Sequence, residues 1–425
     1  MSARRDEQAD AVVVGAGLTG LVAAVRLARA AGRGRRVLLL EAGGEPGGRA
    51  RTTEHHGFRL GLGPRAVYRT TRDGLRALGV RVPGRSPRLG GSQALRDGAL
   101  HPGYAAAGPL LRTPLLTARE RIAVARLLGL ARGRTDLAGT DAAQWLGERL
   151  PTERARQAAF AVLRMSSYTG RPDLIGADAL SLHFAEVRRG VEYVDGGWRT
   201  LTEALLARAR ELGVDVRTGR RCAAVEGGAR PRLVTADGQA VRARSVVLAG
   251  LPQHAAHQLL GLAGPGQGPP LARPLHTACL DVALSRLPNP RSTLVYGVDE
   301  PLYLSVFSAT ARLAPEGGAV LHLARYDDGA GLDAAEVRKR LYELLDLSQP
   351  GWRDAVVHER FLPRITTMTA LPEARTGGLT GRPGIRVSGH QGVFVAGDWV
   401  GPHGLLANAC MLSGIRAAEA AAARL

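Results

Sequence analysis

Three glycines near the start of the chain, Gly15, Gly17 and Gly20, have the G-x-G-x-x-G spacing of a turn that binds a pyrophosphate. Gly15 allows a tight turn, Gly17 lets the pyrophosphate approach the backbone, and Gly20 lets a helix pack closely on a strand. Leu18 and Thr19 would then lie in a helix N-terminus, whose free N–H groups and positive dipole end attract the anion.

A carboxylate at Glu41 adds to this chemistry, since it lies 21 residues after Gly20 and can accept both hydroxyls of an adenosine ribose. An acid at this position also disfavours the 2′-phosphate of NADP. The apolar run Ala9 to Val14 predicts a strand before the glycines. Leu21 to Ala31 predicts a helix, and Val37 to Leu40 predicts a second strand that ends at Glu41. Strand, helix, strand and acid together predict a dinucleotide-binding βαβ unit.

The next residues carry a resemblance to a known family. The run GAGLTG and the later run LLLEAGGEPGGR resemble the flavoprotein superfamily that contains amine oxidases, protoporphyrinogen oxidases and phytoene desaturases. The resemblance implies FAD as the cofactor, with Ala42 beside the acid and with Gly47, Gly48 and Arg49 along the pyrophosphate. Gly57 to Pro64 resembles the segment that passes the flavin ring, which adds Gly63, Pro64 and the following Arg65 to the expected cofactor site.

Further segments resemble the same family. VEYVDGGW, Val191 to Trp198, is similar to the entry into the second cofactor-binding stretch, and Thr200 with Glu203 predicts a capping box for a helix from Leu201 to Leu212. The strand with Cys222 and Val225 corresponds to one whose backbone faces the adenine. A hairpin is predicted around Asp237-Gly238, and the strand from Ser245 to Ala249 follows it.

The C-terminal part repeats the strand–turn–helix pattern, with a strand from Val393 to Ala396, the pair Gly397-Asp398 and a helix from Leu405 to Ala423. The resemblance implies that Asp398 lies on the ribityl and phosphate end of FAD. It also implies that the last helix points its N-terminus at the pyrimidine edge, which places Gly404, Leu405 and Leu406 near the ring. A positive helix end would stabilise the negative charge of a reduced flavin.

The expected fold class is α/β: a Rossmann-like FAD-binding domain of the glutathione-reductase type, with an interleaved α+β substrate domain. The FAD-binding domain would comprise residues 1–78, 189–250 and 385–425, and the substrate domain residues 79–188 and 251–384. In the second of these, Leu115 to Leu130 and Ala334 to Leu347 predict helices. Leu302 to Phe307 and Ala319 to Ala324 predict strands, and Gly261 to Pro274 predicts a loop.

Composition excludes several other classes. The 425 residues carry a net charge of +19, but the charge is almost all arginine spread along the chain, so a nucleic-acid partner is not expected. No apolar run is long enough to span a membrane, and no leader peptide is evident, so a cytoplasmic protein is expected. The cysteines Cys222, Cys279 and Cys410 lie far apart, and no histidine or cysteine spacing fits a metal site, which predicts reduced thiols and no metal.

The expected reaction is hydride abstraction from a C–H bond of an apolar small molecule, in the style of the desaturase-like branch. No second dinucleotide motif is present, so oxygen or a quinone is the expected electron acceptor. Arg65 and His403, beside flavin-lining segments, are candidates to polarise a substrate or move a proton. The lone lysine, Lys339, lies in a charged stretch rather than near a cofactor motif, which disfavours the amine oxidase arrangement.

Two other functions stay open from the sequence: oxidation of a small amine or amino-acid-like substrate, and a non-catalytic scaffold that keeps the nucleotide fold. The arginine-bearing stretch from Leu110 to Leu130 leaves open a peripheral membrane contact, although a buried helix face is the simpler interpretation. The sequence alone does not define the oligomeric state or the substrate.

Overall fold

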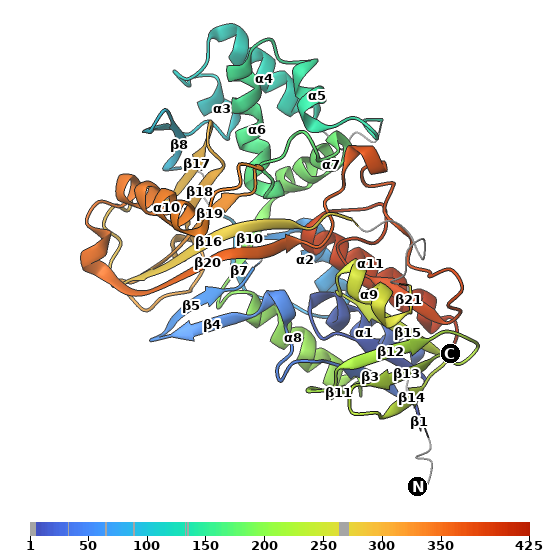
Figure 1. Ribbon diagram of the computed structural model, residues 1–425. Coiled ribbons are helices and arrows are strands. Elements are labelled where there is room, and N and C mark those ends of the chain that lie inside the picture. The colour runs from blue at the N-terminus through green and yellow to red at the C-terminus, as the bar shows by residue number, and fades with distance from the viewer. Residues whose placement is uncertain are drawn as a thin grey trace.

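The structure is a computed structural model that describes residues 6–32, 34–63, 66–87, 90–131, 133, 136–262 and 272–425. Figure 1 shows a lower part built around a parallel sheet and an upper part in which helices lie over a larger sheet. The chain passes between the two parts repeatedly, so that segments far apart in sequence form one sheet. This mixed α/β arrangement agrees with the fold class expected from the sequence.

A five-stranded parallel sheet forms the centre of the lower part. Val12 pairs with Leu38 on one side and with Val246 on the other, and Val246 pairs in turn with Val393. The sheet therefore unites strands from the first forty, the middle and the last thirty-odd residues. In spatial order its strands are β11 (Asp215–Arg217), β3 (Val37–Leu40), β2 (Ala11–Val14), β15 (Ser245–Ala249) and β21 (Val393–Ala396).

Both faces of this sheet are buried, which is why its strands are apolar throughout rather than alternating. Val13, Leu39 and Val247 point to one face, where helices pack, and Val12, Leu38 and Val246 point to the other, where a small sheet packs. The helices are α1 (Leu18–Ala31), α8 (Trp198–Glu211) and α11 (Leu406–Ala422), and the small sheet consists of β1 (Glu7–Gln8), β14 (Ala240–Arg242), β13 (Arg232–Thr235) and β12 (Cys222–Glu226).

The upper part is organised by a seven-stranded, mainly antiparallel sheet. One face packs on α10 (Ala334–Ser348) through an aliphatic cluster that includes Leu280, Leu321 and Leu341. The other face turns toward the lower part. In order the strands are β20 (Val356–Met368), β16 (Leu275–Leu284), β19 (Ala319–Tyr326), β18 (Leu302–Val306), β17 (Leu294–Gly297), β8 (Ser92–Arg96) and β9 (Ala99–Pro102).

A helical layer lies at the top of Figure 1 and packs around Trp145 and Phe160. Its helices are α3 (Ala107–Leu110), α4 (Ala118–Leu130), α5 (Ala142–Gly147), α6 (Glu153–Ser167) and α7 (Ala177–Arg188). The remaining elements connect the layers: β4 (Thr52–His55), β5 (Phe58–Gly61), β6 (Ala66–Tyr68), α2 (Arg69–Ala77), β7 (Gly84–Arg85), β10 (Val191–Val194) and α9 (Gln253–Leu259).

Most elements expected from the sequence occur, with shifted ends. Helix α1 begins at Leu18 rather than Leu21, because Gly17 is its N-cap and the last motif glycine lies inside the first turn. The hairpin at Asp237-Gly238 joins β13 to β14 as predicted. The expected loop from Gly261 to Pro274 falls largely outside the described residues.

The capping box predicted for the middle helix is wrong. Helix α8 begins at Trp198, two residues before Thr200, and its N-cap is Gly197 without a side-chain cap. The Thr200 hydroxyl instead donates to the carbonyl oxygen of Asp195 at 2.9 Å, and Glu203 pairs with Arg199 at 2.7 Å. The pattern S/T-x-x-E was present, but Gly197, with φ of 79°, already ends the preceding turn.

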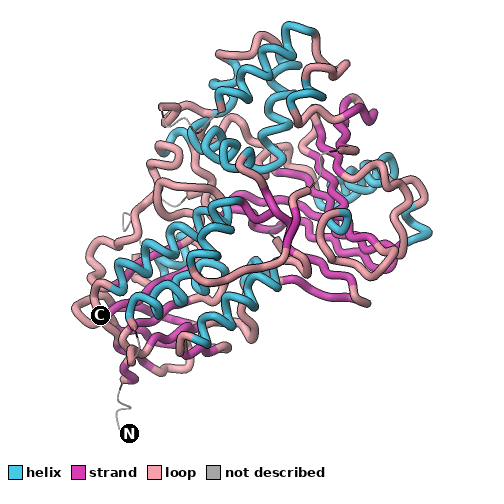
Figure 2. Tube along the Cα trace, turned by 180° about the vertical axis from the view of Figure 1, so that it is seen from behind, coloured by secondary structure: helices cyan, strands magenta, loops and turns pink. Residues whose placement is uncertain are grey.

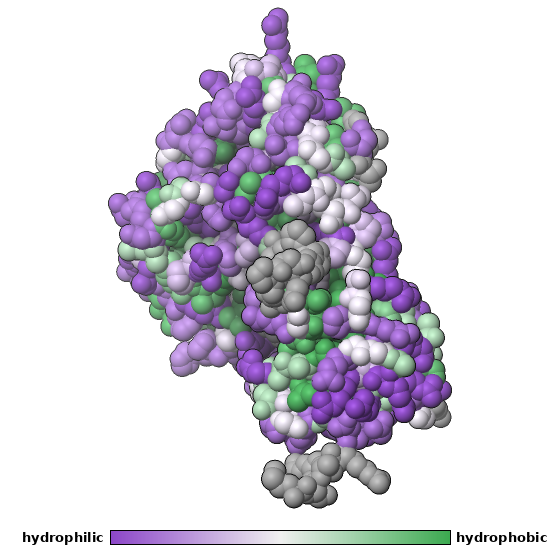
Figure 3. Space-filling model, turned by 45° about the vertical axis from the view of Figure 1, so that its right-hand side comes forward, coloured by the Kyte–Doolittle hydropathy of each residue, from purple (hydrophilic) through white to green (hydrophobic). Residues whose placement is uncertain are grey.

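The view from behind in Figure 2 shows the helices of the lower part lying side by side against one face of the parallel sheet. On the face drawn in Figure 3, hydrophilic side chains predominate and hydrophobic ones show in small groups. Within the described ranges, no helix is both long and apolar enough to cross a bilayer.

Candidate functional site

The glycine turn lies at the carboxyl end of β2, where it joins α1. Gly15 has φ of 98°, and a Cβ there would lie 2.5 Å from the carbonyl oxygen of Ala249. A Cβ on Gly20 would lie 1.7 Å from the carbonyl oxygen of Gly15, so helix and turn pack directly on each other. Both positions accept only glycine, for the two structural reasons that the motif predicts.

Gly17 serves a different purpose, because its backbone is extended and the space beside it is held open by another glycine loop. The N–H of Gly47 donates to the carbonyl oxygen of Ala16 at 2.8 Å, and Gly17 and Gly47 form a parallel bridge. A Cβ on Gly48 would lie 3.4 Å from the Cα of Gly17. Two backbones thus approach without side chains at the N-terminus of α1, which has no side-chain cap. Leu18 and Thr19 form the first turn, so the geometry suits a bound phosphate.

Glu41, directly after β3, is oriented by the same turn. One carboxylate oxygen accepts the N–H of Ala16 at 2.8 Å, and the other accepts the N–H of Gly43 at 2.8 Å, across Ala42. Each oxygen keeps lone-pair capacity for a further donor. The carboxylate is therefore fixed beside the glycine turn, with room to accept two hydroxyls.

Arg49 and Asp398 meet at the far side of the glycine loops. Both terminal nitrogens of Arg49 lie 3.1 Å from Oδ2 of Asp398, whose side chain is 2% exposed, and Nη1 also donates to the carbonyl oxygen of Thr367. The Thr369 N–H donates to the same Oδ2 at 3.0 Å, and the Thr369 hydroxyl donates to Oδ1. Burial opposes ionisation of Asp398, but Arg49 and Thr369 outweigh it and hold the pKa of the carboxyl below its usual value. An ionised carboxylate thus follows β21.

The turn between Asp398 and α11 carries backbone strain at a non-glycine residue. Leu405 is the N-cap of α11, and Leu406, its first residue, has φ of 53°, in the left-handed region. Gly404 also has a positive φ, and a Cβ there would lie 3.0 Å from the N–H nitrogen of Ala409. Such strain in a helix-initiating turn is typical of a ligand site.

Other predicted residues are placed differently. A Cβ on Gly63 would lie 2.8 Å from the carbonyl oxygen of Arg49, so this segment does run against the Arg49 loop. Pro64 and Arg65 lie outside the described residues. His403 is exposed and lines a surface cavity of about 360 Å³ together with Leu412 and Arg416 on α11.

Cys222 and Val225 lie on β12 and are buried in the cluster between the small sheet and the parallel sheet. All three cysteines are free and buried. No group of three or more histidine, cysteine or acidic side chains in the described part of the chain is arranged to hold a metal.

Sequence inspection missed an array of tyrosines on the sheet face that turns toward the lower part. Tyr303 on β18 and Tyr326 on β19 pack with Cys279 on β16, and Tyr168 stacks edge-on against Tyr326 with 5.9 Å between ring centroids. Tyr193 on β10 hydrogen-bonds Tyr303. Burial raises the pKa of Tyr68, Tyr193 and Tyr326 well above the usual value, with neighbouring tyrosines adding to the shift. These phenols are therefore neutral at physiological pH. Tyrosines 125 residues and more apart gave no local signal.

A buried polar network occupies the same sheet face. His322 on β19 lies 2.7 Å from Asp281 on β16, and Arg360 on β20 donates to the other oxygen of Asp281 at 2.5 Å. Arg360 also donates to the hydroxyl of Thr53 and to the carbonyl oxygen of Gly61. The network ties the large sheet to the β4–β5 hairpin and fully engages its carboxylate.

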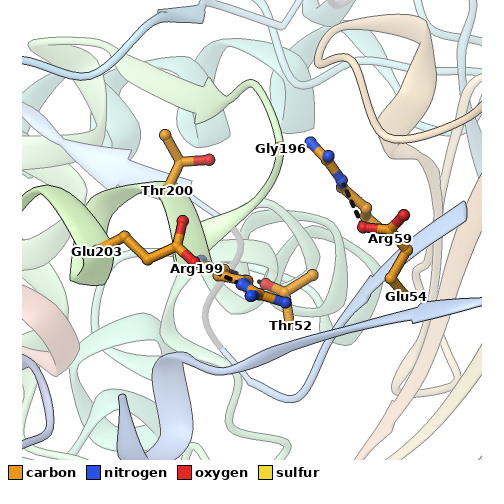
Figure 4. A pocket seen from close by; sticks show the side chains of 7 residues that line it. All are labelled: Thr52, Glu54, Arg59, Gly196, Arg199, Thr200 and Glu203. Atoms are coloured by element: carbon orange, nitrogen blue, oxygen red, sulfur yellow. Dashed lines mark hydrogen bonds and ion pairs between the residues drawn. The ribbon is translucent and has the colours of Figure 1, made fainter. Parts of the chain in front are cut away.

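Figure 4 shows a further pocket, of about 210 Å³, between the β4–β5 hairpin and the start of α8. Its walls are polar and balanced in charge, since Glu54 pairs with Arg59 at 3.2 Å and Arg199 pairs with Glu203 at 2.7 Å. Every charge drawn there is matched by a neighbour, so the pocket offers no unpaired group to a ligand.

Comparison with known proteins agrees with this geometry. The family of flavin-containing amine oxidoreductases matches residues 18–422, so the chain belongs to that family. It is an FAD-dependent oxidoreductase with a small-molecule substrate and an electron acceptor. A comparison with curated protein sequences gives no match.

Three solved structures illustrate the shared fold. An oxidoreductase from Methanosarcina mazei is 17% identical with a TM-score of 0.76, covering 96% of this chain and 100% of its own. A triple mutant of putrescine oxidase is 18% identical with a TM-score of 0.76, covering 99% and 100%. Cyclohexylamine oxidase from Brevibacterium oxydans IH-35A is 17% identical with a TM-score of 0.72, covering 98% and 99%. These likenesses establish the fold.

The described residues fit FAD. The glycine cradle at Gly17 and Gly48 leaves the volume that side chains would fill, and the strained turn at Leu406 lies at the opposite end of the Asp398 cluster. Arg382, which no motif contains, adds a buried guanidinium whose Nε and Nη2 have no hydrogen-bond partner in the described structure. A ligand rich in oxygen acceptors would satisfy it.

Proposed function

We propose that this protein is an FAD-dependent dehydrogenase or desaturase that removes hydride from an apolar small molecule carrying an oxygen acceptor. The observation that carries the proposal is the tyrosine array on β10, β18 and β19. Its phenols are neutral hydrogen-bond donors in an apolar setting, and Tyr326 is 1% exposed with a hydroxyl that has no partner among the described residues. Such a wall suits a carbonyl, ether or phenol oxygen on an otherwise apolar molecule.

Two further observations favour an uncharged substrate over an amine. The carboxylate nearest the array on this sheet face, Asp281, already binds Arg360 and His322. Lys339 lies on α10 with 65% of its side chain exposed, beside Glu336, on the other face of the large sheet. A protonated amine would therefore meet phenols without a free counter-charge.

An amine oxidase remains the second candidate, because tyrosine faces also attract cations and two of the similar structures are named as amine oxidases. The two functions differ in what reduces the flavin, so they are separable by experiment.

We assign the cofactor as follows. Glu41 would bind the adenosine ribose, the turns of Gly17 and Gly48 with Arg49 the pyrophosphate, and Asp398 the ribityl end. Bound FAD supplies the hydride-accepting ring. The protein positions it with these groups and covers the reacting side with the tyrosine array.

The domain division follows from the same assignment. Residues 1–78, 189–250 and 385–425 would form the cofactor domain, and residues 79–188 and 251–384 the substrate domain. Arg65 and His403 stay predictions as proton-handling groups. The exposed position of His403 in a surface cavity makes Arg65 the first residue to test.

The test is anaerobic bleaching of the enzyme-bound flavin by two matched panels, one of apolar phenols, ketones and polycyclic alcohols and one of primary and secondary amines. The first panel should bleach the 450 nm band, and Tyr326→Phe should raise the substrate concentration needed while leaving the FAD spectrum unchanged. Bleaching by amines alone would overturn the proposal. Admitting oxygen and measuring peroxide then distinguishes oxygen from a quinone as acceptor.

An apolar substrate also gives a reason to test membrane contact. Leu111, Ile122 and Leu130 are 54%, 48% and 55% exposed on and beside α4, interspersed with the exposed Arg119 and Arg126. We propose that this face rests on anionic lipid. Pelleting with vesicles of phosphatidylglycerol should carry the wild type down and leave Ile122→Ser/Leu130→Ser in solution; equal behaviour of the two would refute the contact.

A further inference from the structure

Arg382 carries a guanidinium that the protein itself leaves incompletely bonded. Its Nη1 donates to the carbonyl oxygen of Gly404 at 2.9 Å. Its Nε and Nη2 are buried and have no hydrogen-bond partner in the described structure. A buried N–H without an acceptor destabilises the fold, and a buried charge does so more strongly. This arrangement is therefore costly unless a ligand completes it.

The neighbouring carboxylates do not complete it. Asp398 and Asp178 attract Arg382 through space, but neither lies within 4 Å of its nitrogens. Asp398 is bound to Arg49 and Thr369, and Asp178 accepts the N–H of Leu379 at 3.0 Å. Burial lowers the pKa of Arg382 to about 10, so the group stays protonated at neutral pH. A cation with two free donors thus faces the interior.

The position of Arg382 along the cofactor site follows from a chain of contacts. Glu41 bonds the turn of Ala16, Gly17 bridges to the Gly47 loop, and Arg49 in that loop reaches Asp398. The segment of Arg382 runs beside the loop after Asp398, since the N–H of Gly401 donates to the carbonyl oxygen of Pro383 at 2.8 Å.

Arg382 therefore lies beyond Asp398, at the end of the site opposite Glu41. If the ribose binds at Glu41 and the ribityl chain at Asp398, the next part of an extended FAD is the flavin ring. Gly404, to which Arg382 is bonded, opens the turn that starts α11, so the guanidinium and the positive end of the helix lie together.

We propose that Arg382 binds the flavin half of FAD, donating Nε and Nη2 to the oxygen-bearing pyrimidine edge. The inference rests on the cofactor placement given under Proposed function but not on the substrate. A fixed guanidinium there would favour the ring state with negative charge at that edge, in addition to holding the oxidised ring. Arg382 is a positioning and charge-stabilising residue that no cofactor motif contains.

The experiment compares the wild type with Arg382→Met, Arg382→Lys and, as a matched control, Arg386→Met, an exposed arginine four residues along the same segment. Three quantities are measured: the FAD dissociation constant of the apoprotein, the melting temperature with and without FAD, and the sulfite dissociation constant of the FAD-bound protein. Sulfite reports charge stabilisation at the pyrimidine edge independently of any substrate.

Arg382→Met should weaken FAD binding about ten- to hundred-fold, the range for losing hydrogen bonds from a charged group. It should weaken sulfite binding at least about ten-fold, by the same loss of charge stabilisation. The apoprotein should melt at the same or a higher temperature than the wild type, because an unsatisfied buried cation has been removed. Arg382→Lys should recover part of the sulfite affinity, and Arg386→Met should change none of the three.

Two results would overturn the inference. A lower melting temperature of apo Arg382→Met with unchanged FAD affinity would make Arg382 a structural residue only. Weaker FAD binding with unchanged sulfite affinity would move its contact to the adenosine diphosphate half. A wild type that binds FAD normally but fails every substrate panel would reject the proposed reaction while leaving this inference intact.

Discussion

Replacing Asp398 by asparagine isolates the contribution of one buried charge to the stability of the cofactor site. Asp398 accepts four hydrogen bonds, three on Oδ2 from Arg49 and the Thr369 N–H and one on Oδ1 from the Thr369 hydroxyl. An asparagine can keep its oxygen at the Oδ2 position and turn its amide toward the hydroxyl, which can accept as well as donate. The substitution therefore removes the charge while preserving the bonding pattern.

The magnitude follows from the two bonds to Arg49. Each changes from a charge-assisted to an ion–neutral hydrogen bond, a loss of about 1 kcal/mol apiece, so the free energy of unfolding should fall by about 2 kcal/mol. Asp398→Ala, which also leaves Thr369 and Arg49 unpaired, should lose about 3–5 kcal/mol, toward the lower value because Arg49 is 37% exposed. Asp73→Asn, at an exposed ion pair with Arg69, should lose less than about 0.5 kcal/mol.

The assay is urea unfolding of the apoprotein between pH 7 and pH 3. The pKa of Asp398 is lower in the folded than in the unfolded chain, so the stabilisation is complete above the unfolded value and is lost as the pH falls through the folded one. The gap between wild type and Asp398→Asn should therefore be constant from pH 7 to about pH 5 and narrow below about pH 4. A gap that does not change with pH, or no gap at neutral pH, would refute the assignment of a buried carboxylate paired with Arg49.

Three other outcomes are expected. Gly15→Ala should abolish FAD retention and destabilise the fold by about 2 kcal/mol or more, whereas Gly44→Ala, which meets open space, should leave the visible spectrum unchanged; a yellow Gly15→Ala protein contradicts the packing at Ala249. Cys222 and Cys410 should react slowly with a disulfide reagent at pH 8, because burial raises their pKa to about 12 and about 11; rapid labelling of the native protein contradicts their burial. Lys339→Met should leave flavin reduction within about two-fold of the wild type, and a larger loss would favour a lysine-assisted amine oxidase.

Local patterns predicted the cofactor end of the molecule well, because each motif there is a consequence of backbone geometry. Gly15 and Gly20 are required by contacts only a few residues or one strand away, and the strands at Val12 and Val393 are continuous apolar runs. The limits of α1 and α8 were missed by two or three residues, since Gly17 and Gly197 act as N-caps without side chains.

The groups that fill the rest of the site were not predictable in this way. Arg382 is one arginine among many, and only its burial next to Gly404 distinguishes it. Tyr193, Tyr303 and Tyr326 come from different strands and converge only when β10 meets the large sheet. Their proximity depends on the tertiary fold, so periodicity and spacing carry no trace of it.

The parallel sheet also has a consequence for how the protein is made. Strand β2 is among the first elements to leave the ribosome, yet its neighbour β15 needs residues 245–249, and β21 needs residues 393–396. The apolar face of α1 is covered by α11, which is made last. These pairings are long-range, so the nascent chain must carry uncovered apolar surface through most of its synthesis. FAD could bind only after that closure, and the supply of cofactor would then act on the yield of folded protein rather than on its turnover alone.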